Sequence, residues 1–153
     1  MSINTHQIVK GMIAGLVATI VLTMLMVMKK TMGVMPELDP VHMMSEMAAQ
    51  KMGGEPNIMI GWVMHFMIGS FVWGGAFALL NQVLPGASQI AKGISLGMAA
   101  WIMMMVGPMP ISGAGLFGLK MGMMTPVMTF MLHIVFGVVL GAVFTKLGNV
   151  EEP

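Results

Sequence analysis

Four long apolar runs, none with a charged residue in its interior, constrain this chain more than any other feature of its sequence. They cover about residues 8–28, 58–80, 90–106 and 121–146. The hydrocarbon core of a bilayer is roughly 30 Å thick, so a helix needs about 20 apolar residues to cross it. We therefore predict an all-α integral membrane protein, a four-transmembrane-helix bundle that forms a single domain over residues 1–153.

The composition supports this prediction and removes several classes of function. The chain is 57% hydrophobic and 8% charged, whereas roughly a quarter of the residues in a soluble domain are charged. The net charge of +1 provides no basic patch for nucleic acid. No cysteine is present, which excludes disulfides, thiolate metal sites and cysteine nucleophiles. The expected partners are the lipid bilayer and other membrane subunits.

The segment between the first two spans has a different character. Asp39 followed by Pro40 is typical of a helix start, because aspartate caps the first backbone N–H groups and proline fits the first helical position. Apolar residues then recur at helical spacing until Gly53-Gly54. The pattern predicts a short amphipathic helix over about residues 40–52 that lies in the membrane interface.

The two halves of the chain resemble each other. Lys10-Gly11 near the start of the first span matches Lys92-Gly93 at the third, and His65 with Gly69 matches His133 with Gly137. These matches indicate a tandem duplication of a helical hairpin. Two-span units return to their starting side, so both termini should lie on the same side of the membrane. Glycine-lined faces favour close helix packing, either within the chain or in self-association.

His65 and His133 are the only ionisable residues that we expect at membrane depth. Imidazole is costly to bury without a partner and is a common ligand of metals and haem iron. Two such residues could hold one b-type haem, with Gly69 and Gly137 leaving room for the macrocycle and Trp73 and Phe136 beside it. Lys51 and Lys120 are the cations available for its propionates. Alternatively, each histidine only hydrogen-bonds within the bundle, with Ser70 and Thr129 as nearby partners.

A copper site is a further interpretation, because the chain contains 24 methionines. Thioether and imidazole ligands together suit Cu(I). Met64 is adjacent to His65 and Met128 lies near His133, so the candidate metal ligands are His65, His133, Met64 and Met128. Methionine also replaces leucine as an apolar filler, and that interpretation requires no ligand.

Conventional catalytic motifs are missing: the sequence contains no P-loop, GxSxG, HExxH or dinucleotide-binding pattern. We therefore expect a non-enzymatic membrane protein that binds haem b or a metal and serves a larger membrane complex. A structural subunit without any ligand is the first alternative, and a Cu(I) carrier or sensor is the second.

The chain resembles a family of small four-helix bacterial membrane proteins known only as a domain of unknown function. The resemblance rests on Lys10-Gly11, on residues 35–39 (MPELD), 61–66 (GWVMHF) and 113–118 (GAGLFG), and on Leu132-His133 with Phe136-Gly137. It covers nearly the whole chain and implies a four-span architecture but no activity. We expect a multi-pass protein of a bacterial inner (plasma) membrane. The lysines on the two sides are nearly balanced, and we favour cytoplasmic termini.

Overall fold

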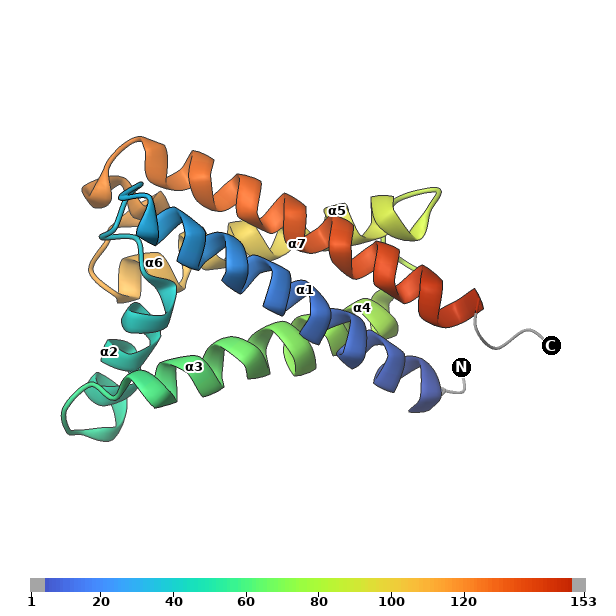
Figure 1. The fold of residues 1–153 in the computed structure, drawn as a ribbon, viewed down its shortest axis with the longest axis horizontal. Helices are drawn as coiled ribbons and strands as arrows, with labels where there is room; N and C mark the ends of the chain where they lie inside the picture. The colour runs from blue at the N-terminus through green and yellow to red at the C-terminus, as the bar shows by residue number, and fades with distance from the viewer. Residues whose placement is uncertain (1–4, 150–153) are drawn as a thin grey trace.

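The computed structural model describes residues 5–149, and four membrane-spanning helical segments dominate it (Figure 1). They are α1 (Thr5–Thr31), the continuous α3–η1–α4 unit (Ile58–Met67, Ile68–Gly74, Gly75–Leu80), α5 (Gln89–Val106) and α7 (Met124–Asn149). Each is long and apolar enough to cross a membrane. This confirms the predicted four-span helical architecture. The start of α1 and the end of α7 lie at the same end of the bundle.

The second span is not a uniform α-helix. Its middle third, η1, is a seven-residue π-helix that begins three residues after His65. π-helical turns are rare and often occur at functional sites. Ser70 in η1 donates a hydrogen bond of 2.9 Å to the carbonyl of Met12 in α1. The wider turn therefore lies where this span meets the first one.

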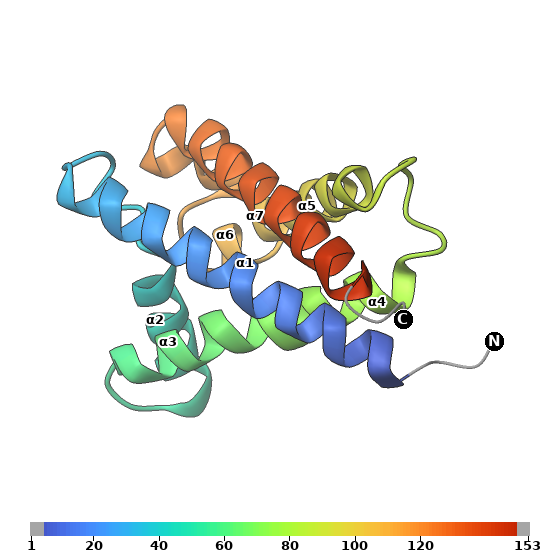
Figure 2. The same ribbon diagram turned by 45° about the vertical axis from the view of Figure 1, so that its right-hand side comes forward.

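The spans pack as two hairpins joined by contact between α1 and α7 (Figure 2). The α3–η1–α4 unit packs on α1, and α5 packs on α7. Glycine residues allow close helix crossing in both hairpins. A Cβ atom added to Gly15 would lie 2.6 Å from the carbonyl oxygen of Gly69, and one added to Gly97 would collide with the carbonyl of His133. The backbones therefore approach so closely that no larger residue fits.

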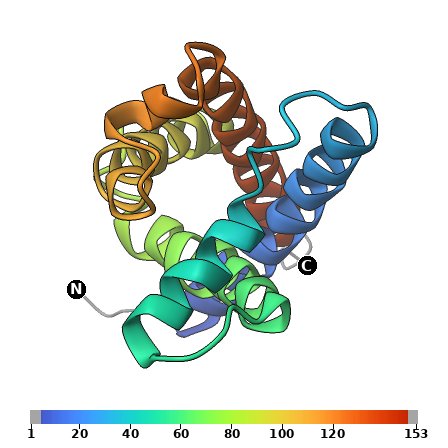
Figure 3. The same cartoon turned by 90° about the vertical axis from the view of Figure 1, so that its left-hand side faces the viewer.

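Helix α2 (Pro40–Met52) confirms the short helix predicted after the first span. The Asp39 carboxylate accepts a hydrogen bond of 3.1 Å from the backbone N–H of His42, which caps the helix. Lys30 forms an ion pair of 2.7 Å with the same carboxylate. Helix α2 packs on α3 and lies across one end of the bundle, as Figure 3 shows from that end.

The connection between the third and fourth spans folds back against the bundle. It contains the short helix α6 (Pro108–Ile111) and the 3-10 turn η2 (Leu116–Met121). Phe117 has a φ of 56°, a left-handed conformation that side chains rarely adopt. Its ring contacts Trp101 at a centroid distance of 5.7 Å. Residues of this connection pack with the first connection and with α5 in a small apolar core, which contains Leu38, Met105, Met109 and Ala114.

Candidate ligand cavity

An apolar cavity of about 320 Å³ lies between the two hairpins, and helix α2 contributes to its wall. All four spans contribute side chains to it. Both predicted histidines lie in its wall, together with Gly69, Met64, Trp73 and Phe136. A volume of this size falls at the lower end of the range for small-molecule sites. The structure thus brings most of the predicted site residues to one place.

His133 is held with one ring nitrogen unused. Its Nδ1 lies 2.8 Å from the backbone carbonyl of Thr129, one turn earlier in α7. A carbonyl oxygen can only accept a hydrogen bond, so Nδ1 carries the proton and donates it. The neutral ring therefore has its lone pair on Nε2. A histidine that binds a metal through Nε2 commonly has its Nδ1–H fixed by a carbonyl in this way.

His65 is held differently, through a bond to the neighbouring helix. Its Nε2 lies 3.0 Å from the hydroxyl oxygen of Thr23 in α1. Thr23 donates its only hydroxyl proton to the carbonyl of Thr19 at 2.7 Å, so the hydroxyl oxygen accepts from His65. His65 therefore carries its proton on Nε2. The side chain is 7% exposed, and its hydrogen bond joins the second span to the first.

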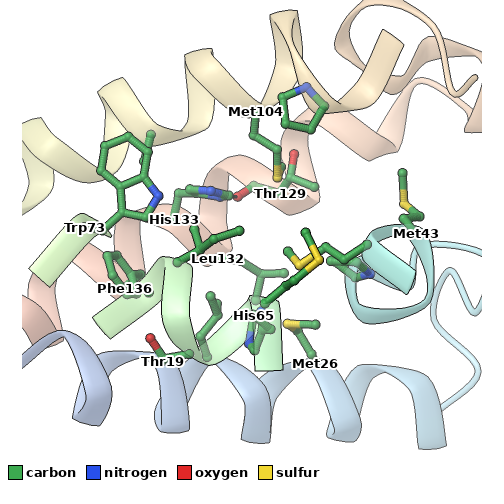
Figure 4. A pocket seen from close by; sticks show the side chains of 18 of the residues that line it. Thr19, Met26, Met43, His65, Trp73, Met104, Thr129, Leu132, His133 and Phe136 are labelled. Carbon is green, nitrogen blue, oxygen red and sulfur yellow. Dashed lines mark hydrogen bonds between the residues drawn. The ribbon is translucent and has the colours of Figure 1, made fainter. Parts of the chain in front are cut away.

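The two imidazoles line the same cavity but are oriented toward different partners (Figure 4). The ring of His65 points to α1, where Thr23 accepts its proton, whereas the ring of His133 bonds back to its own helix. Ligation of one iron from both faces of a porphyrin normally uses the same unoccupied nitrogen on each ring. In this protein Nε2 of His65 forms a hydrogen bond, whereas in His133 it is Nδ1 that forms the hydrogen bond to Thr129.

Methionine is concentrated in the cavity wall. Eight of the 24 lining residues are methionines, a share about twice that in the whole chain, where methionine accounts for 24 of 153 residues. They come from α1, α2, α3, α5 and α6, and they are Met26, Met43, Met44, Met47, Met64, Met103, Met104 and Met109. Among residues 5–149, no aspartate or glutamate lines this cavity. Its donor atoms are therefore soft and neutral.

Two of the predicted site residues lie elsewhere. Gly137 packs against the third span, because a Cβ atom there would collide with the carbonyl of Gly93. Met128 packs with the small core that contains Met105 and Met109 and does not line the cavity. Gly69 does line the cavity, but a Cβ atom there would also collide with the hydroxyl of Thr19. Helix packing therefore explains why position 69 is a glycine.

The polar contacts around the cavity also differ from those expected. Ser70 does not bond to His65 but to Met12, and Thr129 bonds to His133 through its carbonyl rather than its hydroxyl. Lys51 and Lys120, proposed as partners for haem propionates, are not in the wall of the cavity. Thr23 was missed, because a threonine within an apolar run gives no sign of which distant residue it contacts.

Lys29 was also missed, and it is the one cation in the part of the cavity wall that the structure describes. Its ammonium group donates to the carbonyls of Val34, Met35 and Leu38 at 3.1, 2.6 and 3.1 Å, which uses all three protons. The side chain is 7% exposed. In the sequence Lys29 looks like an ordinary flanking lysine beside Lys30. Its role is instead to close the loop that follows α1.

The fold and this cavity define a class: a multi-pass membrane protein in which two helical hairpins enclose an apolar, thioether-rich cavity. Residues 5–153 match the model of a family of unknown function, DUF6789. Since the match spans nearly the whole sequence, the chain belongs to this family. No curated protein and no solved structure matches it.

Proposed function

We propose that this chain is a non-enzymatic membrane protein that binds Cu(I) in the cavity, with Nε2 of His133 as the nitrogen ligand and methionine thioethers as the sulfur ligands. One observation carries the proposal. The Thr129 carbonyl fixes the proton of His133 on Nδ1 and leaves a nitrogen lone pair in a cavity whose wall is one-third methionine. A pre-oriented imidazole surrounded by thioethers is a donor set for a soft metal.

The charge of the cavity supports a soft, monovalent ion over a hard one. Ca²⁺ and Mg²⁺ require carboxylate, carbonyl and water oxygens, and this wall contains no carboxylate. Among the described residues, no three histidine, aspartate or glutamate side chains are grouped closely enough to hold a metal. Cu(I) needs few ligands and accepts neutral sulfur. The flexible methionine side chains can close around it in a cavity larger than the ion.

Met104 is the thioether that we assign first. It comes from α5 and lines the same wall as Thr129 and His133 (Figure 4). Met64, predicted from the sequence, also lines the cavity, but it precedes His65 on the opposite hairpin. We assign His65 a structural role, since its Nε2 proton is donated to Thr23.

A b-type haem between His65 and His133 is the second candidate, favoured by the presence of both histidines, Trp73 and Phe136 in one wall. It ranks lower for two reasons. The Nε2 atom of His65 is engaged, and Lys29 donates all its protons to carbonyls, so no described residue of the wall offers a free cation to a propionate. A structural subunit without a ligand is the remaining alternative. Its predicted glycine faces, however, are used in packing within the chain.

The test is a competition for Cu(I) between the purified protein in mild detergent and the chromophoric chelator bicinchoninate, under anaerobic conditions. We expect one Cu(I) per chain and a loss of affinity of at least about tenfold, or 1.4 kcal/mol, in both His133→Ala and Met104→Leu. The matched control is Met128→Leu, which removes a thioether near His133 in sequence but outside the cavity. It should bind Cu(I) as the unmodified chain does.

Three outcomes would reject this function. Binding that survives His133→Ala places copper elsewhere. A reduced-minus-oxidised cytochrome spectrum that disappears in both His65→Ala and His133→Ala establishes the haem alternative. A folded preparation that binds neither metal nor haem on reconstitution supports the structural subunit.

We propose that the protein lies in a bacterial inner membrane with cytoplasmic termini, which protease accessibility in inverted vesicles can check.

A further inference from the structure

A second hollow of about 370 Å³ lies beside helix α2, between the two connections at that end of the bundle. Its wall is polar, in contrast to that of the cavity. It is lined by Glu37, Asp39, His42, Met43, Glu46, Ser112, Gly113, Ala114, Lys120 and Met121. Met43 lines this hollow and also lines the apolar cavity. The polar hollow and the apolar cavity therefore share a wall, and the thioether of Met43 is part of that wall.

We propose that Met43 is a transfer ligand, which takes Cu(I) from the polar hollow and passes it into the cavity. This inference rests on the proposed function and adds the route by which the metal arrives. The transfer is an exchange of ligands. A donor thioether of the cavity binds the ion as the bond to a ligand in the hollow breaks, and the charge on copper stays +1 throughout.

An alternative route into the cavity would pass through the side of the bundle, between the spans. That route is unfavourable for an ion. The cavity wall includes Val72 of η1 and Met103 of α5, which are 54% and 62% exposed. Both residues lie on spans long and apolar enough to cross the membrane, so this side faces hydrocarbon. A bare cation pays a large desolvation cost there. The acidic residues of the described chain lie in the connection at the end covered by α2.

The charges of the polar hollow favour the approach of a cation. Three carboxylates, Glu37, Asp39 and Glu46, face one lysine, Lys120, in its wall. Asp39 is neutralised in part by Lys30, which lies 2.7 Å away, and Glu46 lies 3.2 Å from Nε2 of His42. Clefts with an excess of one charge concentrate ions of the other. In the described part of the chain these groups do not form a cluster that could hold a metal ion.

Met43 suits a transfer role by its chemistry and position. Its thioether needs no deprotonation to bind a metal, and three rotatable bonds let it move between two spaces. The side chain is half-buried and lies on α2, whose cavity face also carries Met44 and Met47. In Figure 4 it occupies the end of the cavity opposite Trp73 and Phe136. Copper leaving Met43 would thus meet further thioethers on the way to His133.

Stopped-flow loading tests the route separately from the site. The chromophoric Cu(I) complex of bicinchoninate is mixed with the full-length protein, and the loss of its colour gives the loading rate. We expect Met43→Leu to load at least about tenfold more slowly than the unmodified chain, while its equilibrium affinity changes by less than about twofold. The matched control, Met52→Leu on the same helix, removes an exposed thioether that lines neither space, and should load normally.

The outcomes separate this inference from the function on which it rests. If Met43→Leu loads as quickly as the unmodified chain, the transfer role is rejected and the copper site stands. If Met43→Leu loses affinity by the same factor as it loses rate, Met43 is a resident ligand and the transfer role is again rejected. If the unmodified chain binds no Cu(I), the proposed function fails, and the route fails with it.

Discussion

The two hairpins of this bundle use the same close crossing but place their histidines in different chemical situations. Glycine allows backbone contact in both, at Gly15 against Gly69 and at Gly97 against His133. Yet His65 donates its ring proton to the neighbouring helix, whereas His133 donates its proton to its own helix. His65 thereby links two helices through Nε2 and has its lone pair on Nδ1, whereas His133 has its lone pair on Nε2.

The difference follows from two residues on the first helix of each hairpin. When Lys10-Gly11 is aligned with Lys92-Gly93, Thr19 corresponds to Trp101 and Thr23 to Met105. Thr23 supplies the oxygen that accepts from His65. Met105 offers only a thioether, which lies 3.9 Å from the hydroxyl of Thr129. Trp101 donates to that hydroxyl at 3.1 Å. Similar backbones can therefore engage different ring nitrogens of the two histidines.

The shared crossing yields the largest expected effect. In Gly15→Val and Gly97→Val the new side chain must overlap a carbonyl of the opposing helix. We expect each to destabilise the bundle by about 4 kcal/mol or more, because backbone cannot move aside as a side chain can. Thermal unfolding in detergent, followed by circular dichroism, measures this. Gly75→Ala is the control, since its Cβ atom meets nothing within 4 Å, and it should be neutral or stabilising. If one hairpin tolerates its valine, the crossings are not equivalent.

The hydrogen bond of the first hairpin gives the next largest effect. Thr23→Val keeps the shape of the side chain but leaves the Nε2–H of His65 without its acceptor, at a cost of about 1–3 kcal/mol. Thr23→Ser restores the hydroxyl and should recover most of this loss. In the second hairpin, Met105→Leu conserves volume and should cost less than about 1.5 kcal/mol. Unfolding midpoints of the three variants in the same detergent provide the ranking. Equal losses in Thr23→Val and Thr23→Ser would refute the hydrogen bond.

The protonated nitrogen of each histidine ring can be measured in the unmodified protein, and this tests the difference between the two hairpins directly. We expect the Nε2–H form at His65 and the Nδ1–H form at His133, because Thr23 and the Thr129 carbonyl accept from those atoms. Nitrogen chemical shifts of ¹⁵N-histidine, assigned with His65→Ala and His133→Ala, distinguish the forms. Addition of Cu(I) should shift Nε2 of His133 strongly and leave His65 nearly unchanged. The same tautomer at both positions would remove the distinction between the hairpins.

The smallest effect concerns the connections. Burial raises the pKa of Asp39, but the hydrogen bonds from Lys30 and from the backbone of His42 outweigh it and hold the pKa below its usual value. A lowered folded-state pKa stabilises α2 above the unfolded value of about 3.9, and this stabilisation is lost as the pH falls through the folded value. Asp39→Asn should cost less than about 1 kcal/mol, because the ion pair is partly exposed.

Hydrogen-exchange protection of the α2 amides between neutral pH and pH 3 measures this effect. The second connection is the internal reference, since Lys120 is its only charged residue between Pro108 and Gly122. Protection in α6 and η2 should therefore not follow the titration of Asp39. Parallel loss of protection in both connections would indicate that acid loosens the whole bundle.

The sequence by itself determined the four spans, the short helix at residues 40–52 and the repeated hairpin. These features depend on local patterns: uninterrupted apolar runs, a capping aspartate followed by proline, and glycines at helical spacing. The same patterns identified His65 and His133, because an ionisable residue inside an apolar run is conspicuous in any sequence. The π-helical middle of the second span was not foreseen.

Only the tertiary structure decided which ring nitrogen of each histidine is engaged in a hydrogen bond. That depends on the rotation of each ring and on whether an oxygen from another helix lies within about 3 Å, and neither follows from spacing along the chain. Thr23 is 42 residues from His65 in sequence, so their contact exists only once α1 and α3 have crossed. For the same reason, Gly137 and Met128 could not be excluded from the cavity by sequence. Helical periodicity fixes which residues share a face, and only packing fixes what that face meets.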